Sequence, residues 1–373
     1  MTNDRTRVVG IGGGTGLSAL LAGLLRASQA AWQAGHGAAE IAAVVSVADD
    51  GGSTGRLRRH LGLPGVGDLR NCIVALAHGD PLWNDLFQHR FDRGDGLDGH
   101  ALGNLIMAAL IERSGGLQAA IDELTRPLRL GGRVLPATEE PVTLCAELDD
   151  GEVVLGESQI PGRGKRISRV WLHPRAPRPA RGVLETLAGA DAVVLGPGSL
   201  YTSVIPNLLV GGVVDALRTS GALRIFVCNL MTEPGETDGI DAAGHLRAIE
   251  GYLGTGAVDV CLLDAAEPPP ELAARYAAAG SRPVPWTRRS IEETGALPVV
   301  ADLRARGGLL DRHDAHRLGD MILALAQGAE GCPGSPGRGR RAALAAGVRP
   351  GGDEPEDAPA VSTGAPAGER GVE

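Results

Sequence analysis

The sequence predicts an α/β protein with a Rossmann-like, doubly wound and mainly parallel sheet that carries an antiparallel hairpin insertion. From Arg7 onwards, apolar runs of strand length alternate with segments of helical periodicity, the order expected of β-α-β units. Runs such as 191–196 ("DAVVLG") and 258–263 ("VDVCLL") are continuously apolar, as in strands buried on both faces. The chain has 373 residues and 43% of them are hydrophobic, enough for a sizeable core.

The order of the predicted elements supports this class. The first strand, in "RVVGIGG" (7–13), runs into a glycine turn, and "LSALLAGLLRAS" (17–28) has apolar residues at helical spacing. The second strand, "EIAAVVSVA" (40–48), is rich in β-branched residues. Further strands are expected at 191–196, 224–230 and 258–263, each followed by a helical segment. We therefore expect residues 1–327 to form one α/β domain.

Two regions interrupt this alternation. In "VTLCAELDDGEVVLGES" (142–158), Asp150 and Gly151 form a turn signal between two β-rich runs, which predicts an antiparallel hairpin insertion over about 133–173. From about Gly328 the sequence is dense in Pro, Gly and charge and has almost no large apolar residues. Because such a segment cannot bury a core, residues 328–373 are expected to be a disordered tail.

Composition excludes several classes of partner. The net charge of −9 and an aromatic content of 3% disfavour a nucleic acid or an anionic membrane surface as the main partner. The longest apolar runs are far shorter than the roughly 20 residues that span a bilayer, and the N-terminal segment has no apolar signal region. The cysteines are scattered without a CxxC pair, which predicts reduced thiols and a cytoplasmic protein: Cys72, Cys145, Cys228, Cys261 and Cys332.

The glycine-rich turn after the first strand is the first candidate site. A strand, a glycine turn and a helix start let a phosphate approach the backbone amides, which would come from Gly12, Gly13, Gly14, Thr15 and Gly16. The turn does not match GxGxxG, because Thr15 stands at the third glycine, and the next acid at a strand end is Asp49. A dinucleotide oxidoreductase is therefore disfavoured. The alternatives are a nucleotide-binding loop and glycines that only permit tight packing.

Asp49 and Asp50 follow the second strand directly, at the edge where open α/β sheets bind ligands. Their carboxylates could accept ribose hydroxyls, hold Mg²⁺, or act as catalytic groups. In the alternative interpretation they cap the next helix and pair with Arg56, Arg58 or Arg59. The three residues that follow the pair can form an anion-binding amide nest, with Arg56 on the next turn: Gly51, Gly52 and Ser53.

Two helix starts carry further polar residues. "GDLRN" (67–71) contains Asp68, Arg70 and Asn71, and Asp68 is either a ligand-facing group or an N-cap. "GHALGN" (99–104) contains His100 and Asn104. His100 could donate to a phosphate or act as an acid or base, or it could be structural.

The ends of two later strands repeat this arrangement. "LGPGSLY" (195–201) offers a second loop with free amides and a hydroxyl at Gly196, Gly198 and Ser199. "CNLMTEPGET" (228–237) offers Asn229, Thr232, Glu236 and Thr237. Because four polar, glycine-rich loops follow four strands in the same topological position, the sequence predicts a binding cleft there. A standard metal-ligand spacing is missing from the sequence.

Six of these motifs together resemble the 2-phospho-L-lactate transferase (CofD-like) superfamily, and more narrowly its gluconeogenesis-factor branch. They are "GGGTGL" (12–17), "VADDGGSTGRLR" (47–58), "GDLRNCIVALA" (67–77), "GHALGNL" (99–105), "GPGSLYTSVIPNLLV" (196–210) and "CNLMTEPGET" (228–237). The resemblance runs in order over about residues 7–327. It departs from the transferase branch, which has an Asn-Thr-Gly-Asp-Asp context and a Pro-Asp-x-Asp-Thr segment where this chain has Val-Ala-Asp-Asp-Gly-Gly-Ser and Gly-Asp-Leu-Arg-Asn.

The gluconeogenesis-factor branch implies a cytoplasmic protein that binds a UDP-activated amino sugar and links gluconeogenic carbon flow to cell-wall synthesis and cell shape. It implies no particular reaction, and it leaves room for a homo-oligomer and for cell-wall regulatory protein partners. For the UDP-sugar, the resemblance adds Tyr276, which can stack on a ring, and Arg312, which can bind phosphate. The alternative is an Mg²⁺-dependent transferase that moves a phospho-organic acid from a guanylylated donor to a deazaflavin-type alcohol, with Asp49 and Asp50 holding the metal or the acceptor hydroxyl.

Overall fold

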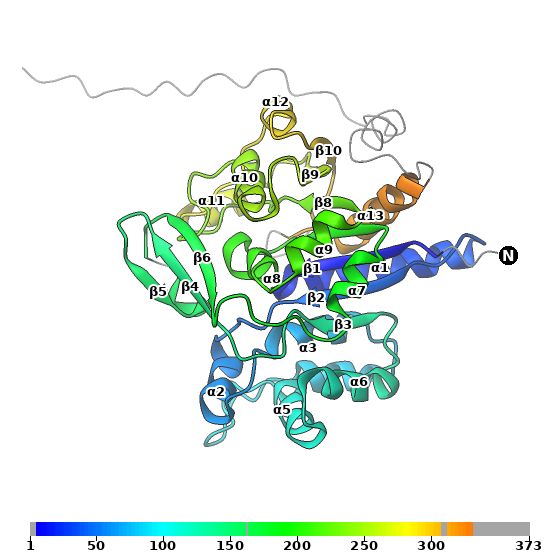
Figure 1. Ribbon diagram of the computed structural model, residues 1–373, viewed down its shortest axis with the longest axis vertical. Helices are drawn as coiled ribbons and strands as arrows, with labels where there is room; N and C mark the ends of the chain where they lie inside the picture. The colour runs from blue at the N-terminus through cyan, green and yellow to red at the C-terminus, as the bar shows by residue number, and fades with distance from the viewer. Residues whose placement is uncertain (1–4, 162, 307–311, 331–373) are drawn as a thin grey trace, which may run out of the picture.

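The computed structural model describes residues 5–161, 163–306 and 312–330. Its centre is a seven-stranded sheet with the strand order β10-β9-β8-β7-β1-β2-β3, and all neighbouring strands are parallel (Figure 1). The strands are β1 (Arg7–Gly12), β2 (Glu40–Val45), β3 (Arg133–Pro136), β7 (Ala192–Leu195), β8 (Leu223–Val227), β9 (Val260–Asp264) and β10 (Leu297–Ala301). The predicted fold class is confirmed.

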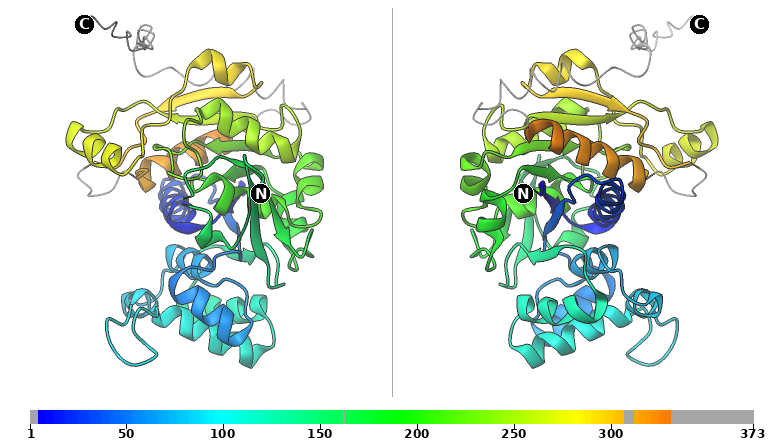
Figure 2. Two further views of the ribbon diagram at one scale, coloured as in Figure 1. Left: turned by 90° about the vertical axis from the view of Figure 1, so that its left-hand side faces the viewer. Right: turned by 90° about the vertical axis from the view of Figure 1, so that its right-hand side faces the viewer.

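Helices cover both faces of this sheet (Figure 2). In one group, α1 (Gly14–Gln33) packs against both α3 (Gly67–Ala75) and α13 (Ala315–Glu330). The other group contains α7 (Val183–Ala188), α8 (Ile205–Leu208), α9 (Val213–Thr219) and α10 (Ala242–Leu253). The remaining helices are α2 (Gly52–Leu61), α4 (Pro81–Gln88), α5 (Leu102–Ser114), α6 (Leu117–Leu128), α11 (Pro270–Ala278) and α12 (Arg288–Glu292). The sheet is therefore doubly wound, as the sequence predicts.

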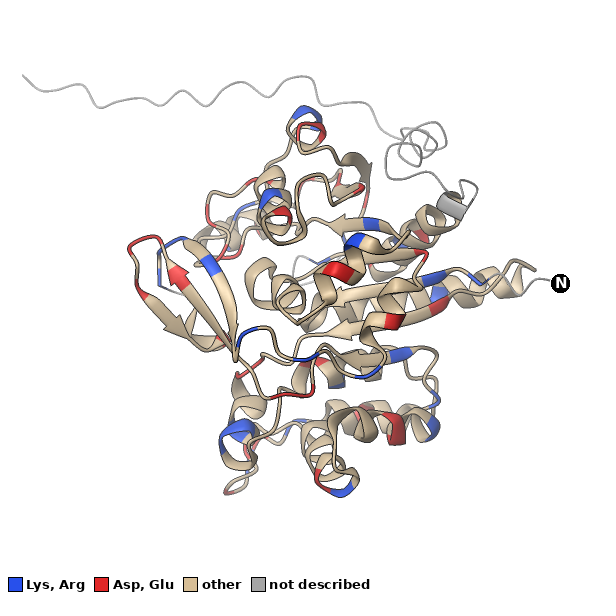
Figure 3. Ribbon diagram, viewed as in Figure 1, with Lys and Arg blue, Asp and Glu red and all other residues tan. Residues whose placement is uncertain are grey.

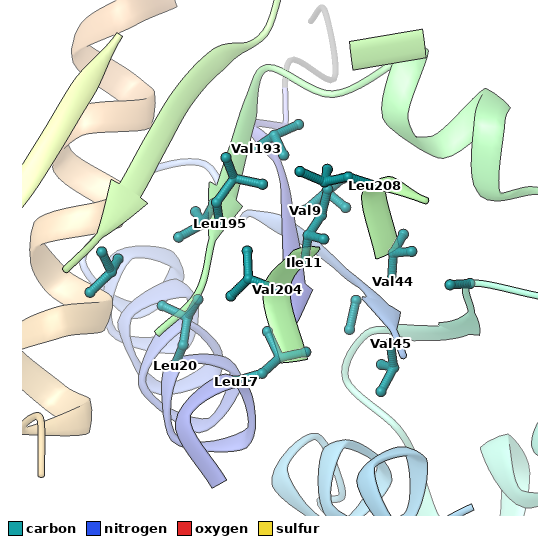
Figure 4. Close-up of a cluster of buried hydrophobic side chains, with 14 of the residues drawn as sticks. Val9, Ile11, Leu17, Leu20, Val44, Val45, Val193, Leu195, Val204 and Leu208 are labelled. Atoms are coloured by element: carbon teal, nitrogen blue, oxygen red, sulfur yellow. The ribbon is translucent and has the colours of Figure 1, made fainter. Parts of the chain in front are cut away.

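The core lies between the central strands and the helices on each face. Figure 4 shows Val9, Ile11, Val44, Val45, Val193 and Leu195 of the strands with Leu17, Leu20, Val204 and Leu208, all at most 3% exposed. The continuous apolar runs of β1, β2 and β7 are buried because both of their faces meet helices. The cysteines that the structure describes, Cys72, Cys145, Cys228 and Cys261, are buried free thiols, as expected.

A close helix contact fixes the C-terminal helix on the sheet. α13, orange in Figure 2, lies beside α1, which is dark blue. The two backbones approach at Gly23 of α1 and Gly319 of α13, where a Cβ on Gly23 would lie only 1.7 Å from the Ala315 carbonyl oxygen. Two glycines at the crossing are what permit this distance. The predicted tail begins within α13, and its residues 331–373 lie outside the described residues.

The inserted segment forms a small antiparallel sheet with the order β5-β4-β6, built from β4 (Thr143–Leu148), β5 (Val153–Leu155) and β6 (Ile167–His173). The predicted hairpin turn lies at Asp150 and Gly151, where Gly151 has a φ of +86°. Residues 133–136, at the start of the predicted insertion, instead form β3 and pair with β2 in the large sheet because they continue its buried apolar edge. Tyr252 of α10 anchors β6, since its hydroxyl accepts from the Val170 N–H at 3.2 Å.

Acidic and basic residues lie next to each other in this small sheet (Figure 3). Lys165, the only lysine in the chain, pairs with Asp150 at 2.6 Å and with Glu152 at 2.7 Å. Hydrogen bonds to Asp150 and Glu152 raise the pKa of Lys165 to about 12. The lysine is therefore charged at neutral pH, which removes it as an amine nucleophile.

No single helix within the described ranges has both the length and the apolar character that a membrane crossing requires. One pair of helices, Leu200–Leu208 with Val213–Thr219, meets the test of length and composition together but is bent by 77°.

Candidate functional site

The candidate site lies where the order of the strands reverses. The chain passes from β1 to β2 and β3 on one side, and then returns through β7, on the other side of β1, to β8, β9 and β10. Open α/β sheets bind their ligands beyond the carboxyl ends of the strands at such a switch point. A cavity of about 310 Å³ lies there, lined by Gly13, Gly14, Thr15, Gly16, Asp49, Asp68, Glu157, Gly198, Ser199, Ser203 and Glu233.

The glycine turn after β1 forms one wall of this cavity. Gly14 has a φ of +64°, a conformation that favours glycine, and α1 begins there with its N-terminus at the cavity. Gly16 lies against the loop after β7, because a Cβ on Gly16 would lie 2.3 Å from the Pro197 carbonyl oxygen. The backbone amides of the turn and the positive end of α1 therefore face the cavity, an arrangement that binds anions.

The loop after β7 is held by the loop after β8. The Gly198 N–H donates to Oδ1 of Asn229 at 3.1 Å, and Nδ2 of Asn229 donates back to the Gly198 carbonyl at 2.9 Å. Gly198 has a φ of +148°, so this turn also depends on glycine. Asn229, predicted as a ligand contact, thus has both ends of its amide bound to the backbone of the second glycine loop.

A π-helix, η2 (Leu200–Val204), follows this loop and places Ser203 at the cavity. Beneath it, Nδ2 of Asn207 donates to the carbonyls of Ser203 at 2.8 Å and Gly12 at 3.1 Å. Asn207 is fully buried and ties the π-helix to the end of β1. π-Helical turns occur frequently at functional sites, where they shift the direction of the side chains that follow.

The adjacent carboxylates Asp49 and Asp50 face different partners. Asp49 lines the cavity, and its Oδ1 accepts from the Gly51 N–H at 2.9 Å. Asp50 turns toward the inserted hairpin, where its Oδ1 accepts from the Ser158 N–H at 2.8 Å. The separation explains how two neighbouring acids are accommodated at the end of one strand.

The arginines near this pair bind backbone carbonyls. Arg58 donates to the carbonyls of Ala48 at 2.8 Å and Asp49 at 2.9 Å, and also to that of Val142. Arg56 donates to the Asp98 carbonyl at 2.6 Å. In the part of the chain that the structure describes, no ion pair joins these arginines to Asp49 or Asp50.

Asp68, at the start of α3, lies directly below the glycine turn. A Cβ on Gly13 would lie 2.4 Å from Asp68 Oδ2, and the Gly14 N–H donates to the Asp68 carboxylate. Burial and the neighbouring charge of Asp49 raise the pKa of Asp68 to about 7, against the opposing effects of the Gly14 N–H and Arg70. This carboxyl can therefore hold or release a proton near neutral pH.

Replacing Asp68 with asparagine is expected to flatten the pH dependence of stability. In the native state the pKa is about 7, whereas the unfolded value is near 3.8, so the native protein binds more protons and loses stability as pH rises between them. The advantage of Asp68→Asn over the parent protein should grow by about 2 to 3 kcal/mol from pH 5 to pH 8. Urea denaturation at the two pH values measures it. Asp92→Asn, at a side chain that is 93% exposed, is the control, and parallel curves for Asp68→Asn would contradict the assignment.

Ser203 and two of the carboxyl groups that line the cavity were not predicted from the sequence. Glu157 comes from η1 (Glu157–Gln159) of the inserted segment, and Glu233 from the loop after β8. Burial, together with Asp68, Asp49, Asp50 and Glu236, raises the pKa of Glu157 well above its usual range. Burial also raises the pKa of Glu233, to which Ser199 donates a hydrogen bond, and burial and Glu233 raise that of Glu236 to about 8.

Ser53, His100 and Asn104 form a buried network behind the cavity wall. The Ser53 hydroxyl accepts from the Ala101 N–H at 3.3 Å and from Asn104 Nδ2 at 3.2 Å, and it lies 3.0 Å from His100 Nδ1. Since the hydroxyl has one proton, it donates to Nδ1, which assigns the histidine proton to Nε2. Burial lowers the pKa of His100, so the ring is neutral at pH 7. The network joins the start of α2 to the start of α5, and none of the three residues lines the cavity.

The other predicted site residues do not line the cavity. Arg70 is buried and donates to Asn71 Oδ1 at 2.6 Å. Thr232 Oγ1 accepts from the Arg282 N–H at 3.0 Å, which joins the loop after β8 to a distant segment. Tyr276 lies on α11 and Arg312 is exposed before α13. The remaining predicted residues, at the ends of β1 and β7 and the start of α2, are Gly12, Gly51, Gly52 and Gly196.

The fit of a metal ion depends on the number of ligands that the protein supplies. Among the residues described, no group of three or more His, Cys, Asp or Glu is arranged to hold a metal ion. Asp49 and Asp68 nevertheless offer two hard carboxylate ligands at the cavity. Mg²⁺ is commonly bound by one or two carboxylates together with substrate phosphates, so these residues fit Mg²⁺ only when a phosphate ligand completes the site.

Comparison with known proteins identifies relatives of this chain. The profile of the family described as 2-phospho-L-lactate transferase CofD matches residues 8–304. A gluconeogenesis factor of Halalkalibacterium halodurans is 42% identical over 86% of this chain and 96% of its own length. One of Bacillus subtilis is 40% identical over 86% of this chain and 98% of its own length. A crystal structure from Bacillus halodurans, described as a member of the UPF0052 family, superposes with a TM-score of 0.80 at 42% identity, covering 86% of this chain and 100% of the other.

Proposed function

This chain belongs to the 2-phospho-L-lactate transferase CofD family, and we propose that it is a cytoplasmic UDP-sugar-binding regulatory protein. In this proposal the bound sugar nucleotide, of the UDP-N-acetylglucosamine type, reports on carbon flow through gluconeogenesis. The protein then passes that information to cell-wall synthesis and cell shape through a protein partner or through its own assembly into a homo-oligomer. The names of the relatives, gluconeogenesis factors of bacteria, support the metabolic part of this proposal.

The observation that carries the ligand class is the pairing of two glycine loops with carboxyl groups around one cavity. The N-terminus of α1 at Thr15 and Gly16, together with Ser199 of the facing turn, suits a diphosphate, because N–H groups and a helix N-terminus stabilise anions. Asp49, Asp68, Glu157 and Glu233 suit the hydroxyls of a ribose or a sugar. A nucleoside diphosphate sugar supplies both kinds of group in one molecule.

The raised pKa values explain how an anion can bind beside so many acids. Burial and mutual repulsion raise the pKa of Asp68 to about 7 and that of Glu236 to about 8, and they also raise that of Glu157. Protonated carboxyl groups carry no charge and can donate as well as accept hydrogen bonds. The repulsion between a diphosphate and the cavity is therefore reduced at neutral pH.

Calorimetric titration with UDP-N-acetylglucosamine, GDP and NAD tests this function. We expect UDP-N-acetylglucosamine to bind in the micromolar range, with an affinity that EDTA does not change. Binding of GDP that requires Mg²⁺, without affinity for the UDP-sugar, would reject the proposal in favour of the transferase alternative. Binding of NAD alone would reject both.

The alternative is transfer of a phospho-organic acid from a guanylylated donor to a deazaflavin-type alcohol. The observation that favours it is that Asp49 and Asp68 both line the cavity. In such a reaction Mg²⁺ would supply charge neutralisation for the phosphates. Asp49 and Asp68 would hold it.

Replacing Arg312 with alanine is expected to weaken binding of the sugar nucleotide and to leave the melting temperature nearly unchanged. The side chain is exposed, so its loss removes little packing, whereas a guanidinium can bind a phosphate in a bidentate manner. Calorimetry and thermal denaturation of the same preparation measure both effects. The exposed Arg93→Ala serves as a charge-matched control. A large drop in melting temperature with intact binding would make Arg312 a structural residue.

A further inference from the structure

The inserted hairpin places a carboxyl group in a cavity that is otherwise built from the large sheet. Glu157, from η1, lines the cavity together with the glycine turn after β1 and the loop after β7. Its neighbours include Asp49, Asp68 and Glu236, whose charges all act on it. The small sheet therefore contributes directly to the binding site through one acidic side chain.

Two contacts with Asp50 fix the position of Glu157. On one side of Glu157, the Ser158 N–H donates to Asp50 Oδ1 at 2.8 Å. On the other side, Gly156 has a φ of +95°, and a Cβ there would lie 2.4 Å from Asp50 Oδ2. The Gly156 N–H also donates to the Leu144 carbonyl at 2.8 Å, which holds this turn on β4. Asp50 therefore contacts the backbone on both sides of Glu157.

We propose that Glu157 is a specificity-determining residue that recognises a hydrogen-bond donor on the sugar of the bound nucleotide, and that Asp50 is the positioning residue that holds it there. The inference rests on the proposed function, because it concerns which part of a nucleoside diphosphate sugar the cavity distinguishes. The two glycine loops supply amides for the diphosphate. Glu157 comes from a separate segment and supplies an acceptor for a hydroxyl or amide N–H on the group attached to that diphosphate.

The hydrogen-bonding chemistry of Glu157 predicts how strongly the protein prefers a ligand that carries the sugar. A site built to bind an O–H or N–H group discriminates against an analogue that lacks it, because the buried polar group of the protein is then left unpaired. UDP has the same nucleoside and diphosphate as UDP-N-acetylglucosamine but lacks the sugar. The wild-type protein should therefore bind UDP-N-acetylglucosamine more tightly than UDP, and Glu157→Met, which has no acceptor oxygen, should reduce this preference by about 10- to 100-fold.

The test is calorimetric titration of the full-length protein with UDP-N-acetylglucosamine and with UDP. Glu157→Met keeps a side chain of similar length but has no acceptor oxygen, and it should leave the affinity for UDP within about twofold. Asp50→Ala should also lose the preference, while Asp50→Asn, whose amide oxygen can still accept from Ser158, should recover most of it. Glu147→Met, on β4 of the same small sheet and paired with Arg169, is the matched control.

Each outcome tests a different part of the proposal. If Glu157→Met keeps the full preference of the wild-type protein, Glu157 does not recognise the sugar. If Asp50→Ala keeps it, Asp50 is not the positioning residue. Equal affinity of the wild-type protein for UDP and UDP-N-acetylglucosamine would overturn the inference but retain nucleotide binding. Wild-type protein that binds neither compound would overturn the proposed function, and the inference with it.

Discussion

Replacing Gly16 with alanine is expected to abolish detectable binding of the sugar nucleotide. A Cβ at this position would lie 2.3 Å from the carbonyl oxygen of Pro197 and 2.7 Å from its carbonyl carbon. Both atoms belong to the backbone of the second glycine loop, so a side-chain rotation cannot relieve the clash. The loops after β1 and β7 must separate, and the amides on the two sides of the cavity then no longer converge on one diphosphate. Calorimetric titration at ligand concentrations that saturate the wild-type protein measures the loss.

The same substitution elsewhere provides the control. Gly251 lies exposed on α10, and a Cβ there would meet no atom within 4 Å. Gly251→Ala should leave binding unchanged and should stabilise the protein slightly, because alanine favours a helix by up to about 1 kcal/mol over glycine. A Gly16→Ala protein that is folded by circular dichroism and still binds normally would show that these loops do not form the site.

Replacing Gly23 with alanine is expected to destabilise the protein by about 3 kcal/mol. The new Cβ would lie 1.7 Å from the Ala315 carbonyl oxygen and 2.7 Å from the Ala315 carbonyl carbon, so α1 and α13 would have to move apart. α13 buries Leu318, Ile322 and Leu325 in the core, and this burial would be partly lost. Urea denaturation measures the effect as a lower midpoint with an unchanged slope.

A second substitution on the facing helix sharpens this test. A Cβ on Gly319 would lie 2.2 Å from the carbonyl carbon of Gly23, so Gly319→Ala should also destabilise the protein. Because either change forces the same separation of the helices, the double variant should lose less than the sum of the single losses. Stabilisation by Gly23→Ala, the result expected from helix propensity alone, would contradict the close approach of the two helices.

Much of the large sheet follows from hydrophobic pattern alone. β7 lies within a predicted strand, and β8 and β9 overlap theirs, because buried parallel strands are continuously apolar and their flanking helices are periodic. β10 was not predicted from the sequence. It is an edge strand of five residues that contains Pro298, and proline is normally a signal against a strand. Since β10 has a neighbour on one side only, proline is tolerated there.

The position of the site could be predicted, but the directions of its side chains could not. The loops at Gly13–Gly16, Asp49, Gly198 and Ser199 line the cavity because strand ends in a parallel sheet converge at one edge. Glu157 was missed because the placement of a hairpin against the sheet depends on tertiary contacts such as that of Ser158 with Asp50. For the same reason, no local pattern shows that the amide of Asn229 binds the Gly198 backbone.

The adjacency of β1 and β7 also has a consequence for folding. The Arg7 N–H donates to Asp191 Oδ2, a contact between residues 184 positions apart in the sequence. Contacts this distant require closure of a long loop before they add stability, and chains dominated by them fold slowly. The cavity comes into existence only when β7 has joined β1, so an N-terminal fragment that ends before β7 has no complete binding site. A ligand that binds there stabilises the finished fold by mass action and selects against partly folded chains.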